Sequence, residues 1–159
     1  MSHQTPAPAD ESPLTAEEYA AVHAAVSSGA GRRIDGRPWT LNSLFEAWQD
    51  LVEEVEEGYG WCAPELDNDL WCRTALAKVW RLLPPRVRTI RQPELDELDA
   101  RFRTATIPWP DRDENPHQPW ELRIPRILET EPAEGRLRGW PMGWGMLPFP
   151  KPDEVEVVE

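Results

Sequence analysis

Acidic side chains gathered in one block are the residues of this 159-residue chain whose types and spacing most clearly suggest chemistry. Residues 38–72 contain nine Asp or Glu and no Lys or Arg, whereas residues 73–91 contain six Lys or Arg and no acid. Four of the acids recur every three or four positions, which places them on one face of a helix: Glu46, Asp50, Glu53 and Glu57. We predict that this acidic stripe attracts a basic partner, because complementary charge speeds association and selects between partners. The alternative is that the stripe faces water or the basic block that follows it.

A second group of candidate residues lies in the stretch that connects two predicted helices. Aromatic and acidic side chains occur together there, in a mixture that suits anchors of a protein interface. We predict that five of them form a partner-recognition edge: Tyr59, Trp61, Asp67, Asp69 and Trp71. In the alternative structural interpretation, Asp67 or Asn68 caps a helix, and Asp69 pairs with Arg73 four positions later. Trp71 points away from the apolar face of its helix, so we expect the Trp-rich C-terminal segment to cover it, with another protein as the alternative.

The sequence offers little support for catalysis or metal binding. Cys62 and Cys72 lie ten positions apart, and the three histidines fall in unrelated segments, so no pair has the spacing of a zinc site. Phosphate-binding, dinucleotide-binding and serine-hydrolase motifs are absent from the sequence. The stretch 67–69 lacks the alternating ligands, central glycine and closing glutamate of an EF-hand loop. We therefore expect no catalytic residue, no metal and no cofactor, with an enzyme of unfamiliar type as an alternative.

The overall charge limits the classes of partner. The chain carries 29 acidic and 17 basic residues, a formal net charge of −12, which disfavours direct binding to nucleic acid or to an anionic membrane. No apolar stretch approaches the roughly 18 residues that a membrane helix needs. The start of the chain lacks the features of a signal peptide, and two cysteines cannot form a disulfide framework. We expect a cytoplasmic protein of one domain whose partner is a basic protein.

Helices are the elements that must position these residues. Thr15 and Glu18 form a capping-box pattern before an Ala-rich run that ends near 28. Seven apolar residues then follow the helical period before Gly58: Leu41, Leu44, Phe45, Trp48, Leu51, Val52 and Val55. A second helix is predicted from 64–69 to 83, where two prolines stop it, and a third from about Pro93. The predicted fold is all-α: a small three-helix bundle over 39–106 with an extra N-terminal helix.

The flanking segments differ from the bundle in composition. Residues 1–14 are predicted to be a disordered arm, and 15–38 a short helix and linker. Residues 106–152 contain ten prolines and four tryptophans, so we predict a long irregular Pro/Trp-rich arm over 107–150, with a possible short strand at 120–124. Residues 151–159 form an acidic tail. The tryptophans of this arm need a surface on which to dock, because disordered chains are poor in aromatic residues.

Short motifs in the bundle resemble those of a known group of proteins. The run Trp48-(x)3-Val52-(x)2-Val55-(x)2-Gly58-Tyr59 is followed by Asn68-Asp69-Leu70 and Arg73, and then by Leu98-Asp99 and Phe102. This pattern over 41–106 resembles small, mostly uncharacterised helical proteins of high-GC Gram-positive bacteria, some of which are like immunity partners of toxins. The resemblance implies an interaction protein, and it carries over no catalytic residue.

The function predicted from the sequence is therefore that of a non-catalytic protein-binding module, most concretely an immunity- or antitoxin-like inhibitor whose acidic helix engages a basic partner. The main alternative is a structural or accessory subunit of a larger complex, held by the Trp/Pro-rich arm.

Overall fold

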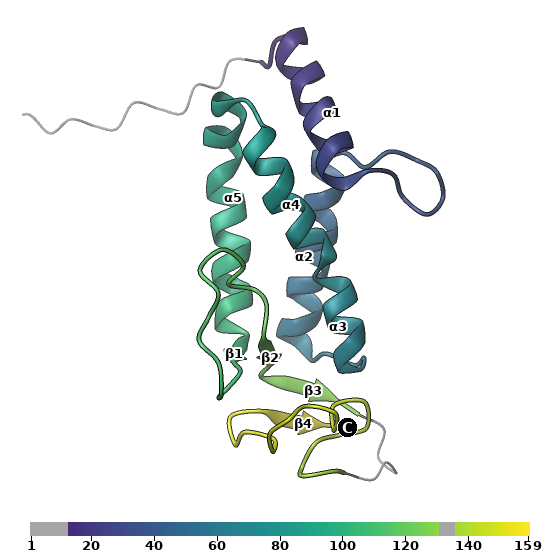
Figure 1. The fold of residues 1–159 in the computed structure, drawn as a ribbon, viewed down its shortest axis with the longest axis vertical. Coiled ribbons are helices and arrows are strands. Elements are labelled where there is room, and N and C mark those ends of the chain that lie inside the picture. The colour runs from purple at the N-terminus through teal and green to yellow at the C-terminus, as the bar shows by residue number, and fades with distance from the viewer. Residues whose placement is uncertain (1–12, 131–135) are drawn as a thin grey trace, which may run out of the picture.

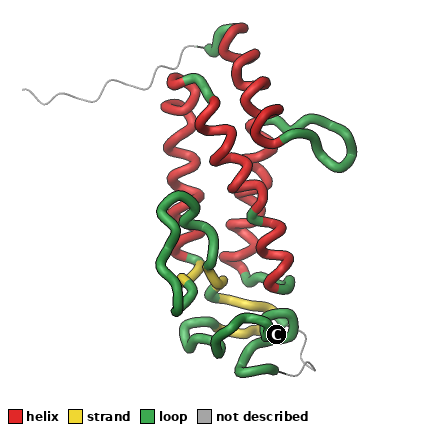
Figure 2. Tube along the Cα trace, in the orientation of Figure 1, coloured by secondary structure: helices red, strands yellow, loops and turns green. Residues whose placement is uncertain are grey.

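The computed structural model describes residues 13–130 and 136–159, and its described part is mainly helical. Helices form the upper and middle parts of an elongated molecule, and short strands lie at its lower end (Figures 1 and 2). In chain order the helices are α1 (Ala16–Ala30), α2 (Leu41–Glu57), α3 (Ala63–Asp69), α4 (Trp71–Leu82) and α5 (Pro85–Thr104). The strands are β1 (Thr106–Pro108), β2 (Arg123–Pro125), β3 (Ile127–Glu129) and β4 (Glu156–Val158). The prediction of a mainly helical protein is confirmed, and the strands are an addition to the predicted all-α class.

Helix α2 is the central element of the core. All seven apolar residues of its predicted stripe are buried, and Trp48 lies against Phe102 of α5 with ring centroids 5.0 Å apart. Thr40 caps the helix by accepting a hydrogen bond from the backbone N–H of Ser43, and Gly58 ends it. Helix α1 begins with the predicted capping box of Thr15 and Glu18. Long amphipathic runs with capping residues are thus the elements that local sequence determines most fully.

The predicted second and third helices differ from the observed ones. The second helix is interrupted at Leu70, which separates the short α3 from α4. The third begins at Pro85 and contains Pro93 in its interior, so the predicted start at Pro93 is wrong. Proline suits the first turn of a helix because its missing N–H would be unpaired there in any case. The pair Pro84-Pro85 therefore ends one helix and immediately begins the next, and the basic residues 86–91 are helical.

Helices α1 and α4 approach each other closely at Gly29. A Cβ atom placed on Gly29 would lie 2.7 Å from Val79 Cγ2 and 2.9 Å from the Val79 backbone nitrogen. Only a residue without a side chain allows this approach, so Gly29 sets the packing of the N-terminal helix. Helix α1 extends through Gly29 to Ala30, two residues beyond the predicted end, and Gly31 forms its C-cap.

The strands join segments that are far apart in the sequence. Strands β1 and β2 pair antiparallel, with Ile107 opposite Ile124, while β3 and β4 pair parallel, with Leu128 opposite Val157. Tyr59 adds to the second sheet, since its backbone N–H donates to Ile127 O at 2.9 Å. The strand suggested at 120–124 is thus observed at Arg123–Pro125, and the last residues of the chain pair with β3 rather than extending away.

The C-terminal segment packs on its own chain. Trp140 and Trp144 are buried, and the Trp144 indole N–H donates to Trp61 O at 2.9 Å. At Gly143, which has a φ of +88°, a Cβ would lie 2.7 Å from Cys62 Cβ, so the backbones of the two segments nearly touch. Trp144 therefore docks on residues 59–62, and Trp140 packs against Trp144 and Phe149. The disordered arm predicted for 1–14 lies outside the described residues, except for Pro13 and Leu14.

No helix in the ranges 13–130 and 136–159 combines the length and the apolar character needed to cross a membrane.

Candidate partner-binding surface

A loop of residues 32–38, which we call the projecting loop, extends from the helical body between α1 and α2 (Figure 1). Its two sides are joined by a bridge between Arg32 and Pro38, and the Arg33 N–H donates to Arg37 O at 2.8 Å. Gly36 turns the chain with a φ of +83°. These hydrogen bonds hold the loop in one shape, and Ile34 is fully exposed to solvent at its turn.

A groove of about 760 Å³ lies beside the projecting loop. Its aromatic wall is formed by Trp39 and Trp71, whose ring centroids are 5.5 Å apart, and the Arg33 guanidinium lies 4.4 Å above the Trp39 ring. Trp71 remains 44% exposed. The prediction that the C-terminal segment covers Trp71 is therefore wrong, because Trp39 packs against it from the end of the projecting loop.

The acidic stripe of α2 begins at this groove. Glu46 and Asp50 line it, and both side chains are exposed. In the described part of the chain, no Lys or Arg lies within ion-pair distance of either carboxylate or of the other two stripe residues, Glu53 and Glu57. Glu53 instead accepts a hydrogen bond from Gln49 at 3.0 Å. Glu46, Asp50 and Glu57 thus present unpaired negative charge to solvent, whereas Glu53 is partly buried and its charge acts on Arg101.

The basic block does not neutralise the stripe. Among the described residues, α2 forms an ion pair through Glu56, which lies beside the stripe and contacts Arg101 of α5 at 2.6 Å. This hydrogen-bonded contact lowers the pKa of Glu56. Within the basic block, Arg73 pairs with Asp99 of α5, and Arg86 pairs with Glu18 of α1. The alternative in which the acidic stripe faces the basic block does not match these contacts.

Tyr59 and Asp69 form an internal contact. Tyr59 is completely buried, and its hydroxyl donates to Asp69 Oδ2 at 2.7 Å. Burial and this hydrogen bond raise the pKa of Tyr59, so the hydroxyl stays protonated. The expected pair between Asp69 and Arg73 is wrong, because Arg73 turns to Asp99. Tyr59 therefore belongs to the core and does not lie on the surface.

Trp61 and Asp67 lie outside the groove. Trp61 is 62% exposed near the start of α3, and Asp67 is exposed in the last turn of the same helix. Neither Asp67 nor Asn68 caps a helix, since the N-caps of α3 and α4 are Cys62 and Leu70 and neither makes a side-chain cap. Of the nine predicted contact residues, the groove brings together Glu46, Asp50 and Trp71.

Sequence reasoning missed the residues of the projecting loop and treated 32–38 as linker. The Asp35-Gly36 dipeptide is a signal for a tight turn, and Asp35 stabilises this one by accepting hydrogen bonds from Arg37. The exposed Ile34 immediately before that dipeptide was the second available signal. Trp39 was assigned to the bundle, and its contact with Trp71 of α4 agrees with that assignment, but the contact itself was not predicted.

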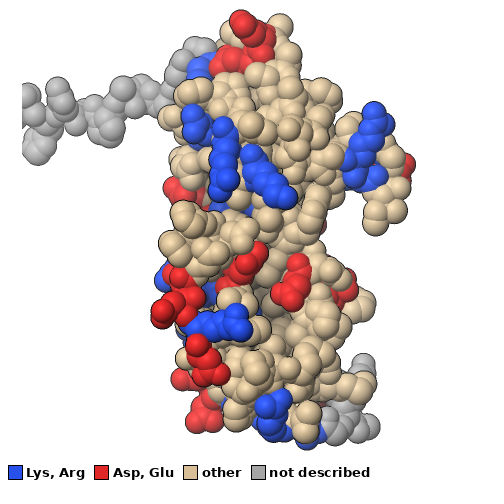
Figure 3. Space-filling view, viewed as in Figure 1, with Lys and Arg blue, Asp and Glu red and all other residues tan. Residues whose placement is uncertain are grey.

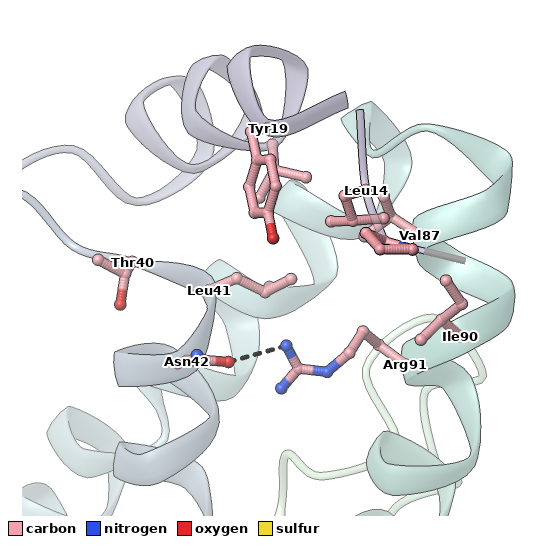
Figure 4. A pocket seen from close by; sticks show the side chains of 10 residues that line it. Leu14, Tyr19, Thr40, Leu41, Asn42, Val87, Ile90 and Arg91 are labelled. Atoms are coloured by element: carbon pink, nitrogen blue, oxygen red, sulfur yellow. Dashed lines mark hydrogen bonds between the residues drawn. The ribbon is translucent and has the colours of Figure 1, made fainter. Parts of the chain in front are cut away.

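A second hollow lies near the N-terminal end of α2, and it shares no lining residue with the groove. It measures about 450 Å³ and is bounded by α1, the start of α2 and α5 (Figure 4). Tyr19, Leu41 and Ile90 give it an apolar wall, and Arg91 reaches across to Asn42 Oδ1 at 2.8 Å. It contains none of the predicted contact residues.

Among the described residues, no group of His, Cys, Asp or Glu side chains is arranged to hold a metal ion. No protein-family model matches the chain, and neither the curated proteins nor the solved structures include one similar enough to count as a match.

Proposed function

We propose that this protein is a non-catalytic protein-binding module, and that it inhibits a basic partner in the manner of an immunity protein or antitoxin. The observation that carries the proposal is Ile34, a fully exposed aliphatic side chain held at the tip of an ordered loop beside an aromatic groove. The partner is a protein with an apolar socket for Ile34 and basic side chains next to that socket.

The apolar residues would supply affinity. Covering an exposed Ile stabilises a complex by about 1.5–3 kcal/mol, and Trp39 and Trp71 add a large apolar surface at the same place. Anchors of this kind, ringed by polar groups, are typical of interface hot spots. The hydrogen bonds that order the projecting loop lower the entropy lost on binding.

The acidic stripe would supply selectivity. Glu46 and Asp50 line the groove without ion-pair partners in the described chain. Arg32, Arg33 and Asp35 line it as well, so the lining carries three acids and two bases and is negative by one charge, which favours a basic protein. Such charges raise the association rate and favour basic partners over acidic ones, and salt screens them.

The alternative role as an accessory subunit has less support. That role requires the Trp/Pro-rich segment to dock on another chain, whereas Trp140 and Trp144 are buried within this chain. The segment still exposes Leu137, Met142 and Met146, but Trp140 and Trp144 are not available as its anchors.

Site-specific crosslinking tests the proposal. A photoreactive phenylalanine analogue replaces Ile34, and in a matched control it replaces Met142, which is also apolar and exposed but lies in the C-terminal segment. The crosslinked protein is identified by mass spectrometry and purified, and its affinity is measured by calorimetry. We expect a basic protein that crosslinks at Ile34 and not at Met142, and whose purified form binds Ile34→Asp at least tenfold more weakly than wild type. Equal affinity for the two forms would refute the proposal.

A further inference from the structure

A second candidate binding site lies between α4, α5 and the loop that precedes β2. This pocket measures about 420 Å³, which falls within the range of about 300–1,000 Å³ that is typical of small-molecule sites. Three arginines line it, Arg73 and Arg81 from α4 and Arg88 from α5, and we call it the arginine pocket. It shares no residue with the groove beside the projecting loop.

Arg73 is a buried cation that lacks one hydrogen-bond partner. It is only 7% exposed, its guanidinium lies 4.1 Å from the centre of the Trp120 ring, and two of its nitrogens donate to Asp99 at 2.8 Å. Asp99 also accepts a hydrogen bond from the Trp48 indole at 3.1 Å. The remaining nitrogen, Arg73 Nη1, is buried and has no partner among the described residues.

Arg88, which lines the pocket from α5, also has a nitrogen without a hydrogen-bond partner. Its Nε is buried without a hydrogen-bond partner in the described residues. No described acid forms an ion pair with Arg88 or with the exposed Arg81. Buried donors in native proteins almost always have an acceptor, which can be protein, ordered water or a bound ion. Two of the three unpaired arginine donors in the described residues, all but Arg33 Nε, thus lie at this one pocket, where the acceptor oxygens of a bound anion would pair with them.

The charge of the pocket is positive overall. Its acids are Asp99, which Arg73 neutralises, and Asp96, which accepts a hydrogen bond from Gln92 at 2.8 Å. After the Arg73–Asp99 pair is set aside, two positive charges (Arg81 and Arg88) remain with one negative charge (Asp96), so the pocket has a net charge of plus one. Basic side chains gather over the upper halves of α4 and α5, with acidic side chains mostly below them (Figure 3). The net charge of −12 repels a nucleic-acid polymer, whereas a small anion meets only the local field.

We propose that the arginine pocket binds a small organic phosphate. Guanidinium groups recognise phosphate oxygens through directed, charge-assisted hydrogen bonds, and several arginines suit a group with three acceptor oxygens better than a carboxylate with two. The organic part of the ligand lies against the apolar wall of Trp80, Leu95 and Trp120. A pocket of about 420 Å³ has room for such a group beside the phosphate.

Titration with model ligands tests this assignment. The full-length protein is titrated with phenyl phosphate, with inorganic phosphate and with phenol, and binding is followed by calorimetry and by the Nε–Hε signals of arginine in NMR spectra. We expect phenyl phosphate to bind more tightly than inorganic phosphate, and phenol not to bind. The signals of Arg73 and Arg88 should shift on binding. Failure of phenyl phosphate to bind at millimolar concentration would overturn the proposal.

Two charge-matched variants make the test specific. Arg88→Gln removes one ligand donor and should weaken phenyl phosphate binding about tenfold or more. Lys78→Gln removes the same charge from an exposed position of α4 outside the pocket, and should change affinity less than twofold. If Arg88→Gln does not fold, as judged by circular dichroism, Arg81→Gln takes its place. Equal weakening by the pocket and control variants would show general charge attraction and would overturn the site.

The outcome is independent of the partner-binding proposal. Ile34→Asp should leave phenyl phosphate binding unchanged, because Ile34 belongs to the groove and not to the arginine pocket.

Discussion

At the scale of single residues, Arg73 is where three parts of the fold meet. It belongs to α4, pairs with Asp99 of α5, and stacks on Trp120 from the loop before β2. Trp48 of α2 shares the Asp99 carboxylate through its indole N–H. The bidentate geometry and the shared acceptor make this a polar connection between helices rather than a surface ion pair.

Asp99→Asn should destabilise the protein strongly. The substitution keeps the shape of the side chain but removes the negative charge that offsets the buried Arg73. Removing one partner of a buried ion pair costs about 3–5 kcal/mol, and the partial exposure of Asp99 places the expected loss at the lower end. Urea denaturation measures the change, with Glu97→Gln, an exposed position of the same helix, as the control. A loss no larger than that of the control would contradict the role of the pair.

For Glu54 we predict that removing the charge stabilises the protein, in contrast to Asp99. Burial and the nearby charges of Asp69 and Glu129 raise its pKa above the usual 4.5, while a hydrogen bond with Trp61 partly offsets them. A raised pKa means that the folded state binds the proton more tightly, so this contribution to stability falls as pH rises from about 4.5 through the raised pKa.

Glu54→Gln should therefore stabilise the protein at pH 7, by less than about 1 kcal/mol because the carboxylate is only partly buried. The gain should disappear as the pH falls below 4.5, where the wild-type side chain is itself neutral. Thermal unfolding followed across this pH range provides the measurement. A gain that is constant with pH would show that the charge of Glu54 is not its cause.

At the scale of elements, the contact between α1 and α4 depends on Gly29. Alanine is normally a better helix residue than glycine, so Gly29→Ala would stabilise an isolated α1. In the protein, the new methyl group would lie 2.9 Å from the Val79 backbone nitrogen, which cannot move as a flexible side chain can. The clash therefore outweighs the gain in helix propensity, and the substitution lowers the free energy of unfolding.

We expect Gly29→Ala to destabilise the protein by about 1–3 kcal/mol, the usual cost of overpacking. The neighbouring exposed position, Ser28→Ala, is the matched control and should be neutral or slightly stabilising. Chemical denaturation of the two variants makes the comparison. Stabilisation by Gly29→Ala would mean that the two helices are less closely packed than the structure shows.

Helices α2 and α5 differ in how well their bounds could be predicted from the sequence. Helix α2 was predictable in its bounds, caps and buried face, because its seven apolar residues follow the helical period between Thr40 and Gly58. The start of α5 was not predictable, because Pro93 resembles the first residue of a helix. In addition, the two prolines at the true start of α5 also end α4. Local patterns specify single helices, and they do not distinguish between two acceptable positions of a proline.

The candidate sites depend more on contacts between elements. The acids of the stripe were found from spacing, and the structure adds that they are unpaired in its described part. The meeting of Trp39 with Trp71, and the choice of Asp99 over Asp69 by Arg73, join residues from separate elements. No local rule of sequence predicts such pairs, which is why the groove and the arginine pocket emerged only with the fold.

At the scale of the whole molecule, the C-terminal segment belongs to the core at the lower end. Trp144 stacks on Trp140 with centroids 6.1 Å apart, meets Tyr59 edge-on at 6.3 Å, and donates to Trp61 O. These contacts connect the segment to the end of α2 and the start of α3. They also help to bury Tyr59.

Trp144→Ala should destabilise the protein by about 3–5 kcal/mol, as expected for a buried tryptophan. Met142→Ala, at an exposed position two residues away, should have little effect. Thermal unfolding of both variants, with near-ultraviolet circular dichroism to report tryptophan packing, tests the expectation. If Trp144→Ala unfolded at the wild-type temperature, the segment would not be part of the core.

The central claim is that the groove beside the projecting loop binds a basic protein through Glu46 and Asp50. The most direct measurement is the dissociation constant of the purified partner, identified by crosslinking at Ile34, for two charge-matched double variants at low and high salt. The account predicts that Glu46→Lys with Asp50→Lys weakens binding at low salt by tenfold or more and flattens its salt dependence. Asp153→Lys with Glu154→Lys, exposed acids far along the chain, should leave binding nearly unchanged. Equal affinities for the two double variants at low salt would contradict the account.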